Sequence, residues 1–186
     1  MKNTLLTLLI AALLSSGIKA YSQSRSSVGF GYGINKPYSG DYKFAKSFQL
    51  QGNIAVAEKW AVSPAIGYDR LLSNNRIIYS SPNFHSLPIG NSDLMYLGAS
   101  ARYSLNKEWF AKAGPIFYVI GGNEDVANVG IGGSGCVGYN LNFTDHSTLA
   151  LSLSTEIVNI PAPTGNGITP VAGLKIAYVF NFMRLK

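Results

Sequence analysis

Acid and base chemistry in this chain would depend on two histidines, His85 and His146. Ser147 and Thr148 follow His146, and Glu156 lies ten positions after it, so a base, two hydroxyls and an acid occur in one segment. In an extended strand that distance is roughly 30 Å, at about 3.3 Å per residue. Because these groups could not share a proton, and because a histidine in a long loop such as His85 is more simply a solvated side chain, we predict no catalytic residue.

Three further features receive structural interpretations. Gly130 to Gly135 match the G-x-G-x-x-G dinucleotide fingerprint, but an alternating segment surrounds them and no helix follows, so these glycines are expected to leave room in a crowded interior or permit a bulge. Asn142-Phe143-Thr144 fits a glycosylation acceptor only in a eukaryotic secretory protein. Cys136 is the single cysteine and is expected to fill space. No group of residues has metal-ligand spacing, and we predict no metal and no cofactor.

The chain is expected to form strands rather than helices, and strands would then position these residues. Helix periodicity is hard to find, and the plentiful residues are Gly, Tyr, Phe, Val, Ile, Ser and Thr. Eight segments alternate apolar residues with small or polar ones. We predict strands over Ser27 to Asn35, Ser47 to Ala57, Trp60 to Leu71, Asp93 to Leu105, Trp109 to Ile120, Val129 to Asn142, Ser147 to Val158 and Ile168 to Phe182.

The alternation gives each strand one apolar and one polar face. Phe48 and Leu50 alternate with Gln49 and Gln51, for example. Strands in lipid must pair every backbone group and leave no open edge, so the pattern predicts an all-β protein, an eight-stranded antiparallel up-and-down transmembrane β-barrel. In such a barrel the apolar rows face lipid and the polar rows form a packed interior, because eight strands leave room only for side chains.

The lengths of the connections provide a second indication. The short connections are Glu58-Lys59, Asn106 to Glu108 and Phe143 to His146, and the longer ones are Lys36 to Lys46, Ser73 to Ser92, Gly121 to Asn128 and Asn159 to Gly167. Long and short connections alternate strictly. A barrel whose ends lie in the periplasm would place the longer connections outside the cell.

The first twenty residues have the features of a signal peptide. Met1 and Lys2 precede an apolar stretch from Leu5 to Leu14, and small residues lead to Ala20. We therefore predict a signal peptide over residues 1–20, a barrel domain over residues 21–186 and a location in the outer membrane of a Gram-negative bacterium. Removing the leader leaves thirteen basic and nine acidic residues, a net charge of +4. The basic residues are scattered, which argues against nucleic-acid binding and favours a weak attraction to anionic lipid head groups.

Aromatic residues lie where two membrane interfaces would be. The set beside the short connections is Trp60, Trp109, Phe143 and Phe182, and Tyr32 and Tyr68 lie toward the opposite strand ends. Aromatic belts at both interfaces are typical of membrane barrels.

Projecting the alternation places five charged residues inside the barrel: Asp69, Arg102, Lys112, Glu156 and Lys175. A buried charge is costly without a partner, and we predict an ion pair between Glu156 and Lys175 on neighbouring strands. Arg102 and Lys112 would face each other across a short turn and would need an acid, an anion or water. A gate or a small anion site is one interpretation of these two cations, and a water-filled end of the lumen is the preferred one.

These segments, the short-turn aromatics and the final aromatic strand from Lys175 to Phe182 resemble the small eight-stranded outer-membrane barrels, the group that contains the membrane domain of outer-membrane protein A and outer-membrane protein X. The resemblance covers the chain after its leader and implies the same barrel fold. It implies contact with outer-membrane lipid and lipopolysaccharide, and it leaves the activity open because this fold hosts several functions.

The leading hypothesis is a structural or adhesive surface protein that binds through its extracellular loops, or an accessory subunit of a larger assembly. The longest loop carries an apolar set that could dock a protein partner: Ile77, Ile78, Tyr79, Phe84 and Leu87. The alternatives are a narrow gated, porin-like pore and, third, an enzyme that modifies lipid A.

Overall fold

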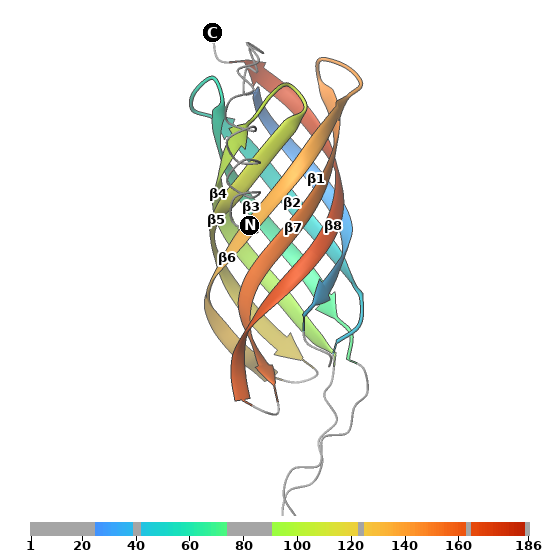
Figure 1. The fold of residues 1–186 in the computed structure, drawn as a ribbon, viewed down its shortest axis with the longest axis vertical. Helices are drawn as coiled ribbons and strands as arrows, with labels where there is room; N and C mark the ends of the chain where they lie inside the picture. The colour runs from blue at the N-terminus through green and yellow to red at the C-terminus, as the bar shows by residue number, and fades with distance from the viewer. Residues whose placement is uncertain (1–24, 39–41, 74–90, 123–124, 163–164, 185–186) are drawn as a thin grey trace, which may run out of the picture.

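A computed structural model describes residues 25–38, 42–73, 91–122, 125–162 and 165–184. Eight strands form a closed barrel in which each strand is antiparallel to both neighbours, and β1 pairs with β8 to close it (Figure 1). The strands are β1 (Arg25–Pro37), β2 (Ala45–Ala55), β3 (Trp60–Leu71), β4 (Ser92–Ser104), β5 (Trp109–Gly122), β6 (Asp125–Asn142), β7 (Ser147–Ala162) and β8 (Gly165–Arg184). The predicted fold class is confirmed.

Apolar side chains face outward and polar side chains face the lumen. Leu153 on β7 is 68% exposed and Ile176 on β8 is 41% exposed, whereas Gln51 and Lys175 are each 5% exposed. This inverts the arrangement of a soluble protein and is the arrangement that hydrocarbon around the barrel requires. No helix in the described part of the chain is long and apolar enough to span a membrane.

The strands on one side of the barrel are longer than predicted. Only residues 123–124 separate β5 from β6, and only residues 163–164 separate β7 from β8, so the expected longer connections over 121–128 and 159–167 are wrong. The backbone continues its antiparallel pairing there, from Val158 opposite Thr169 to Ala162 opposite Gly165. Glycines and prolines in these segments indicated turns, but Gly121, Gly122, Pro161, Gly165 and Gly167 lie in paired strands (Figure 1).

The two ends of the barrel are named by their connections. The short-turn end carries residues 56–59, 105–108 and 143–146, and the long-loop end carries the connection between β3 and β4. The short turns are tight, since Trp60 N–H donates to the Ala57 carbonyl and Leu105 N–H donates to the Trp109 carbonyl. The three predicted short connections are confirmed.

The interior is less polar than predicted, because two apolar layers occupy the lumen. The long-loop cluster consists of Tyr42, Ala45, Leu71, Leu94, Tyr96, Ile116, Tyr118, Ile120, Val158 and Val171. The short-turn cluster consists of Phe110, Ala150, Ala177 and Val179, with Cys136 packed against it as a space-filling residue. Four of these buried residues, Phe110, Ile116, Tyr118 and Ile120, are on β5, and most of the others are on β3, β4, β7 and β8.

Glycines on neighbouring strands make room for the inward aromatic rings. A Cβ atom at Gly67 would collide with the Tyr96 ring, and one at Gly138 would collide with the Phe110 ring. The same holds for Gly130 beside Tyr118, which confirms the packing interpretation of the glycine-rich segment in β6. In a barrel this narrow, a glycine at the paired position on the neighbouring strand leaves room for each of these rings.

Candidate functional site

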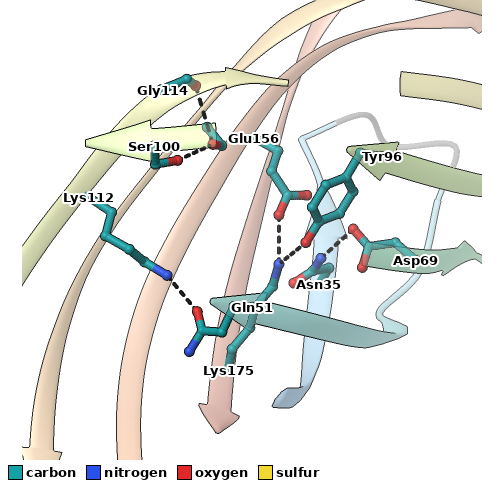
Figure 2. Close-up of polar contacts among 10 residues, drawn as sticks. Asn35, Gln51, Asp69, Tyr96, Ser100, Lys112, Gly114, Glu156 and Lys175 are labelled. Carbon is teal, nitrogen blue, oxygen red and sulfur yellow. Dashed lines mark hydrogen bonds and ion pairs between the residues drawn. The ribbon is translucent and has the colours of Figure 1, made fainter. Parts of the chain in front are cut away.

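The candidate site is a polar layer in the lumen between the two apolar clusters, and Lys175 on β8 is its centre. Lys175 Nζ donates hydrogen bonds to Glu156 Oε1 at 2.6 Å and to the Tyr96 hydroxyl at 3.0 Å (Figure 2). Both side chains of the ion pair are almost fully buried. The ion pair predicted between these two strands is present.

The register explains how this pair forms. Lys175 is paired with Ser152 on β7 and with Gly33 on β1, while Glu156 is paired with Val171. The two charged residues are therefore offset along the strands, and the long lysine side chain bridges the offset. Gly33 makes this possible, since a Cβ there would lie 2.8 Å from Lys175 Cγ.

Asp69 on β3 is fully buried in the lumen, but it forms no ion pair with another described residue. Its Oδ2 atom accepts a hydrogen bond of 2.7 Å from the Asn35 amide on β1 (Figure 2). The prediction placed Asp69 correctly inside and missed Asn35. β1 and β3 are both paired with β2, so Asn35 reaches Asp69 across that strand, and the contact follows from the register of these three strands.

Arg102 on β4 and Lys112 on β5 are direct partners across the strand pair, as predicted. Each contacts neutral acceptors. Arg102 donates to the Asn53 and Asn140 side-chain oxygens at 3.4 Å each, and its guanidinium carbon lies 3.8 Å from the centre of the Phe110 ring.

Lys112 Nζ donates to Gln51 Oε1 at 2.7 Å (Figure 2) and lies 5.9 Å from the Phe110 ring centre. Among the described residues, no carboxylate forms an ion pair with either Lys112 or Arg102. Glu156 lines the same cavity as Lys112, but it pairs with Lys175. Amide oxygens and the face of one aromatic ring, which attracts cations, take the place of a carboxylate.

A cavity of about 40 Å³ lies in this layer. Its charged lining residues are Lys112, Lys175 and Glu156, and its hydroxyl-bearing lining residues include Ser63, Ser100, Ser134, Ser152 and Ser154. The Ser154 hydroxyl has no hydrogen-bond partner among the described residues. A space of this size can hold water or a small ion, since one water needs about 10–15 Å³.

The wall beside the cavity is interrupted at Pro115. The pairing of β4 with β5 skips from Gly98 opposite Ile116 to Ala101 opposite Ala113, and Pro115, which has no N–H, lies in the gap. The Ser134 hydroxyl on β6 donates to the Gly114 carbonyl at 3.3 Å. Serines of the lumen thus take part in the backbone hydrogen bonding of the wall.

The predicted interfacial aromatics lie on the outer surface. At the short-turn end, Trp60 contacts Tyr103 and Trp109 contacts Tyr139, with ring centres 4.8 and 5.2 Å apart. Phe143 and Phe182 are also exposed there. Sequence inspection missed the two tyrosine partners because only the register of β4 and β6 places them beside the tryptophans.

Toward the long-loop end the register places Tyr32, Phe48 and Tyr68 side by side on β1, β2 and β3. The Tyr32 and Phe48 rings are 5.2 Å apart. The Tyr68 hydroxyl donates to Asp93 Oδ1 at 2.6 Å. The row therefore combines apolar ring contacts with a polar contact at Tyr68.

The predicted separation of His146 from Glu156 matches the geometry. His146 Nδ1 lies in the 143–146 turn, 3.1 Å from the Asn181 carbonyl, and its ring stacks on Phe180, while Glu156 is paired with Lys175 in the lumen. In the described residues, no three His, Cys, Asp or Glu side chains are grouped to hold a metal. The predicted loop set Ile77, Ile78, Tyr79, Phe84 and Leu87, together with His85 and the leader, lies outside the described residues.

Comparison with solved structures identifies the same fold in bacterial outer-membrane proteins. Neisserial surface protein A covers 86% of this chain and 98% of its own, with 16% identity and a TM-score of 0.56. OprG from Pseudomonas aeruginosa covers 86% of this chain and 97% of its own, with 12% identity and a TM-score of 0.54. Ail, the attachment invasion locus protein of Yersinia pestis, covers 86% and 99%, with 14% identity and a TM-score of 0.50. No model of a known protein family and no curated protein matches the sequence.

Proposed function

We propose that this protein is a bacterial outer-membrane barrel that acts by binding partners at its long-loop end, as a structural or adhesive surface protein or as a subunit of a larger outer-membrane assembly. The outward apolar surface and the two rows of interfacial aromatics support the location. The packed lumen supports the mode of action, because a barrel that is filled internally offers its outer surface and loops for function.

The single observation that carries the proposal is the pair of apolar layers in the lumen. Leu71, Leu94 and Ile120 are almost fully buried near the long-loop end, and Phe110 is 2% exposed near the short-turn end. Hydrated solutes would have to pass the long-loop cluster, which has members on β2, β3, β4, β5, β7 and β8. One protein of this fold, Ail, is an attachment invasion locus protein, which supports a role of this kind.

The test replaces residues 74–90 with a glycine-serine linker of equal length in cells that display the protein. The variant should remain in the outer membrane and keep its shift in gel mobility on boiling, while adherence of the cells to a host-cell monolayer falls to that of cells without the protein. Replacement of the short turn at residues 143–146 by glycine and serine is the matched control and should leave adherence unchanged. Full adherence of the 74–90 variant would contradict the proposal.

A narrow gated pore is the second candidate, and the polar layer around Lys175 is the observation that favours it. If this layer were a gate, Glu156→Ala would alter single-channel conductance in planar bilayers. We expect both the wild type and the variant to be silent, because the apolar layers remain. Stable channels in the wild type would favour the pore.

The proposed function involves no chemistry, and the third candidate, a lipid A-modifying enzyme, is tested separately. Mass spectrometry of lipid A from cells with and without the protein should give the same masses. A gain or loss of one acyl chain would contradict the proposal and would direct attention to the residues around His85.

Lipopolysaccharide is the proposed lipid partner of the outer wall. A groove of about 500 Å³ near the long-loop end is lined by apolar side chains that include Ile34, Phe44 and Leu174, and Lys36 lies at its edge. Lys36 Nζ lies 5.2 Å from the Phe44 ring centre. An acyl chain fits the apolar wall and a phosphate fits the lysine, so Lys36→Gln should reduce co-purification of lipopolysaccharide, whereas Lys107→Gln at the short-turn end should not.

A further inference from the structure

We propose that the lumen cavity beside Lys112 is a binding site for a small monovalent inorganic anion, of which chloride is the representative. The anion would serve as a counter-ion for Lys112 and the neighbouring Arg102. This inference concerns the interior of the barrel and stands independently of the proposed binding function of its loops.

The charges of the lumen are the first reason. The five charged residues predicted inside, Arg102, Lys112, Lys175, Asp69 and Glu156, carry three positive and two negative charges, a net charge of +1. Lys175 pairs with Glu156 at 2.6 Å, and Asp69 accepts a hydrogen bond from the neutral Asn35 amide. The remaining charges, Arg102 and Lys112, are adjacent and have the same sign. In a medium of low dielectric constant two neighbouring cations repel strongly, and intramembrane charges are normally paired. The described residues supply only neutral acceptors to this pair, so an anion would remove an excess of positive charge.

The hydrogen-bond donors are the second reason. An ammonium group has three N–H donors, and Lys112 uses one of them on Gln51. Ser154 lines the same cavity, and its hydroxyl has no hydrogen-bond partner in the described part of the chain. Ser100 also lines the cavity, and its hydroxyl makes a long contact of 3.5 Å with the Ser134 hydroxyl, so it can turn toward the cavity. A cation and two hydroxyl groups therefore face one small space.

Size and charge select the class of ligand. The cavity of about 40 Å³ has room for a monatomic anion with water, whereas an organic anion such as gluconate is too large. Glu156 also lines the cavity, and its carboxylate would repel a divalent anion more strongly than a monovalent one. The site is therefore expected to accept chloride or bromide and to be indifferent to exchange of sodium for potassium.

The first test measures unfolding of the purified, refolded barrel by urea in sodium chloride and in sodium gluconate of equal ionic strength. A ligand that binds only the folded state stabilises that state by mass action. At chloride concentrations well above the dissociation constant, each tenfold rise in chloride should therefore raise the folding equilibrium constant about tenfold. Gluconate should have no such effect. Lys112→Met should lose the chloride dependence, and Lys107→Met, which alters an exposed lysine in a turn, should keep it.

The second test uses the unaltered protein and therefore does not depend on a variant that folds. Crystals grown in sodium bromide should show an anomalous scattering peak within hydrogen-bond distance of Lys112 Nζ. Identical unfolding curves in chloride and gluconate, or bromide peaks confined to the outer surface, would overturn the proposal and favour a cavity filled with water. The adherence assay would be unaffected by either result.

Discussion

Substitution of Glu156 by glutamine tests the central ion pair of the lumen, because it removes one charge and changes the side chain's shape little. The Lys175 and Glu156 side chains are 6% and 3% exposed, so solvent cannot replace the lost partner. Breaking a buried pair by removing one charge costs about 3–5 kcal/mol. The glutamine oxygen can still accept from Lys175, and the Tyr96 hydroxyl remains at 3.0 Å, so we expect the lower limit, about 3 kcal/mol.

A loss of about 3 kcal/mol lowers the ratio of folded to unfolded protein by more than about a hundredfold. Urea unfolding of the barrel in lipid vesicles measures it, with gel mobility and the fluorescence of Trp60 and Trp109 as two independent signals. Glu58→Gln, in an exposed turn, is the matched control and should change the free energy of unfolding by no more than about 0.5 kcal/mol.

The double variant Glu156→Gln with Lys175→Met completes the cycle. Lys175→Met alone leaves a buried carboxylate without its cation and should cost about 3–5 kcal/mol. With both charges removed, most of the loss should be recovered, so the coupling energy should be at least about 2 kcal/mol. Effects of the two single substitutions that add to within about 0.5 kcal/mol would refute the conclusion that these residues compensate each other.

Three further predictions concern the outer surface and the packing of the lumen. Ile176→Arg should cost about 2–4 kcal/mol in vesicles because its side chain faces hydrocarbon, and a cost below about 0.5 kcal/mol would indicate a water-facing wall. Gly67→Ala should cost about 1–3 kcal/mol in urea unfolding because the new methyl group meets the Tyr96 ring, whereas Gly133→Ala, with nothing within 4 Å, should be nearly neutral. Phe110→Ala should cost about 3–5 kcal/mol by the same measurement, since it empties the short-turn cluster, and an unchanged midpoint would mean that this layer does not stabilise the barrel.

The fold was predictable because alternation is a local property of the chain. Leu151 and Ser152 must point to opposite faces wherever the strand lies, so the sequence identified which side chains face lipid. The extra length of β7 and β8 was not predictable, because Pro161 and the glycines near position 165 indicate turns locally. Pairing of the two strands with each other overrides that preference, and no local pattern records it.

The sequence predicted which charged residues belong to the candidate site but only some of the contacts between them. Alternation placed Asp69, Arg102, Lys112, Glu156 and Lys175 inside, and neighbouring strands suggested the pair that forms. It did not reveal that Gln51 reaches Lys112, since these residues are on β2 and β5 and meet only across the lumen. Sequence inspection also expected a polar interior throughout. The inward apolar residues are distributed over several strands, and only the closed barrel gathers them into clusters.

The amino-acid sequence by itself therefore determined the number of strands, the direction in which each side chain faces and the surroundings that an apolar exterior requires. These depend on a period of two residues and on the need to pair every backbone group in lipid. The tertiary structure alone decided which inward charges meet, which are left with neutral partners and where a cavity remains. Those outcomes depend on register, strand offset and closure of the barrel, which bring together residues far apart in the chain.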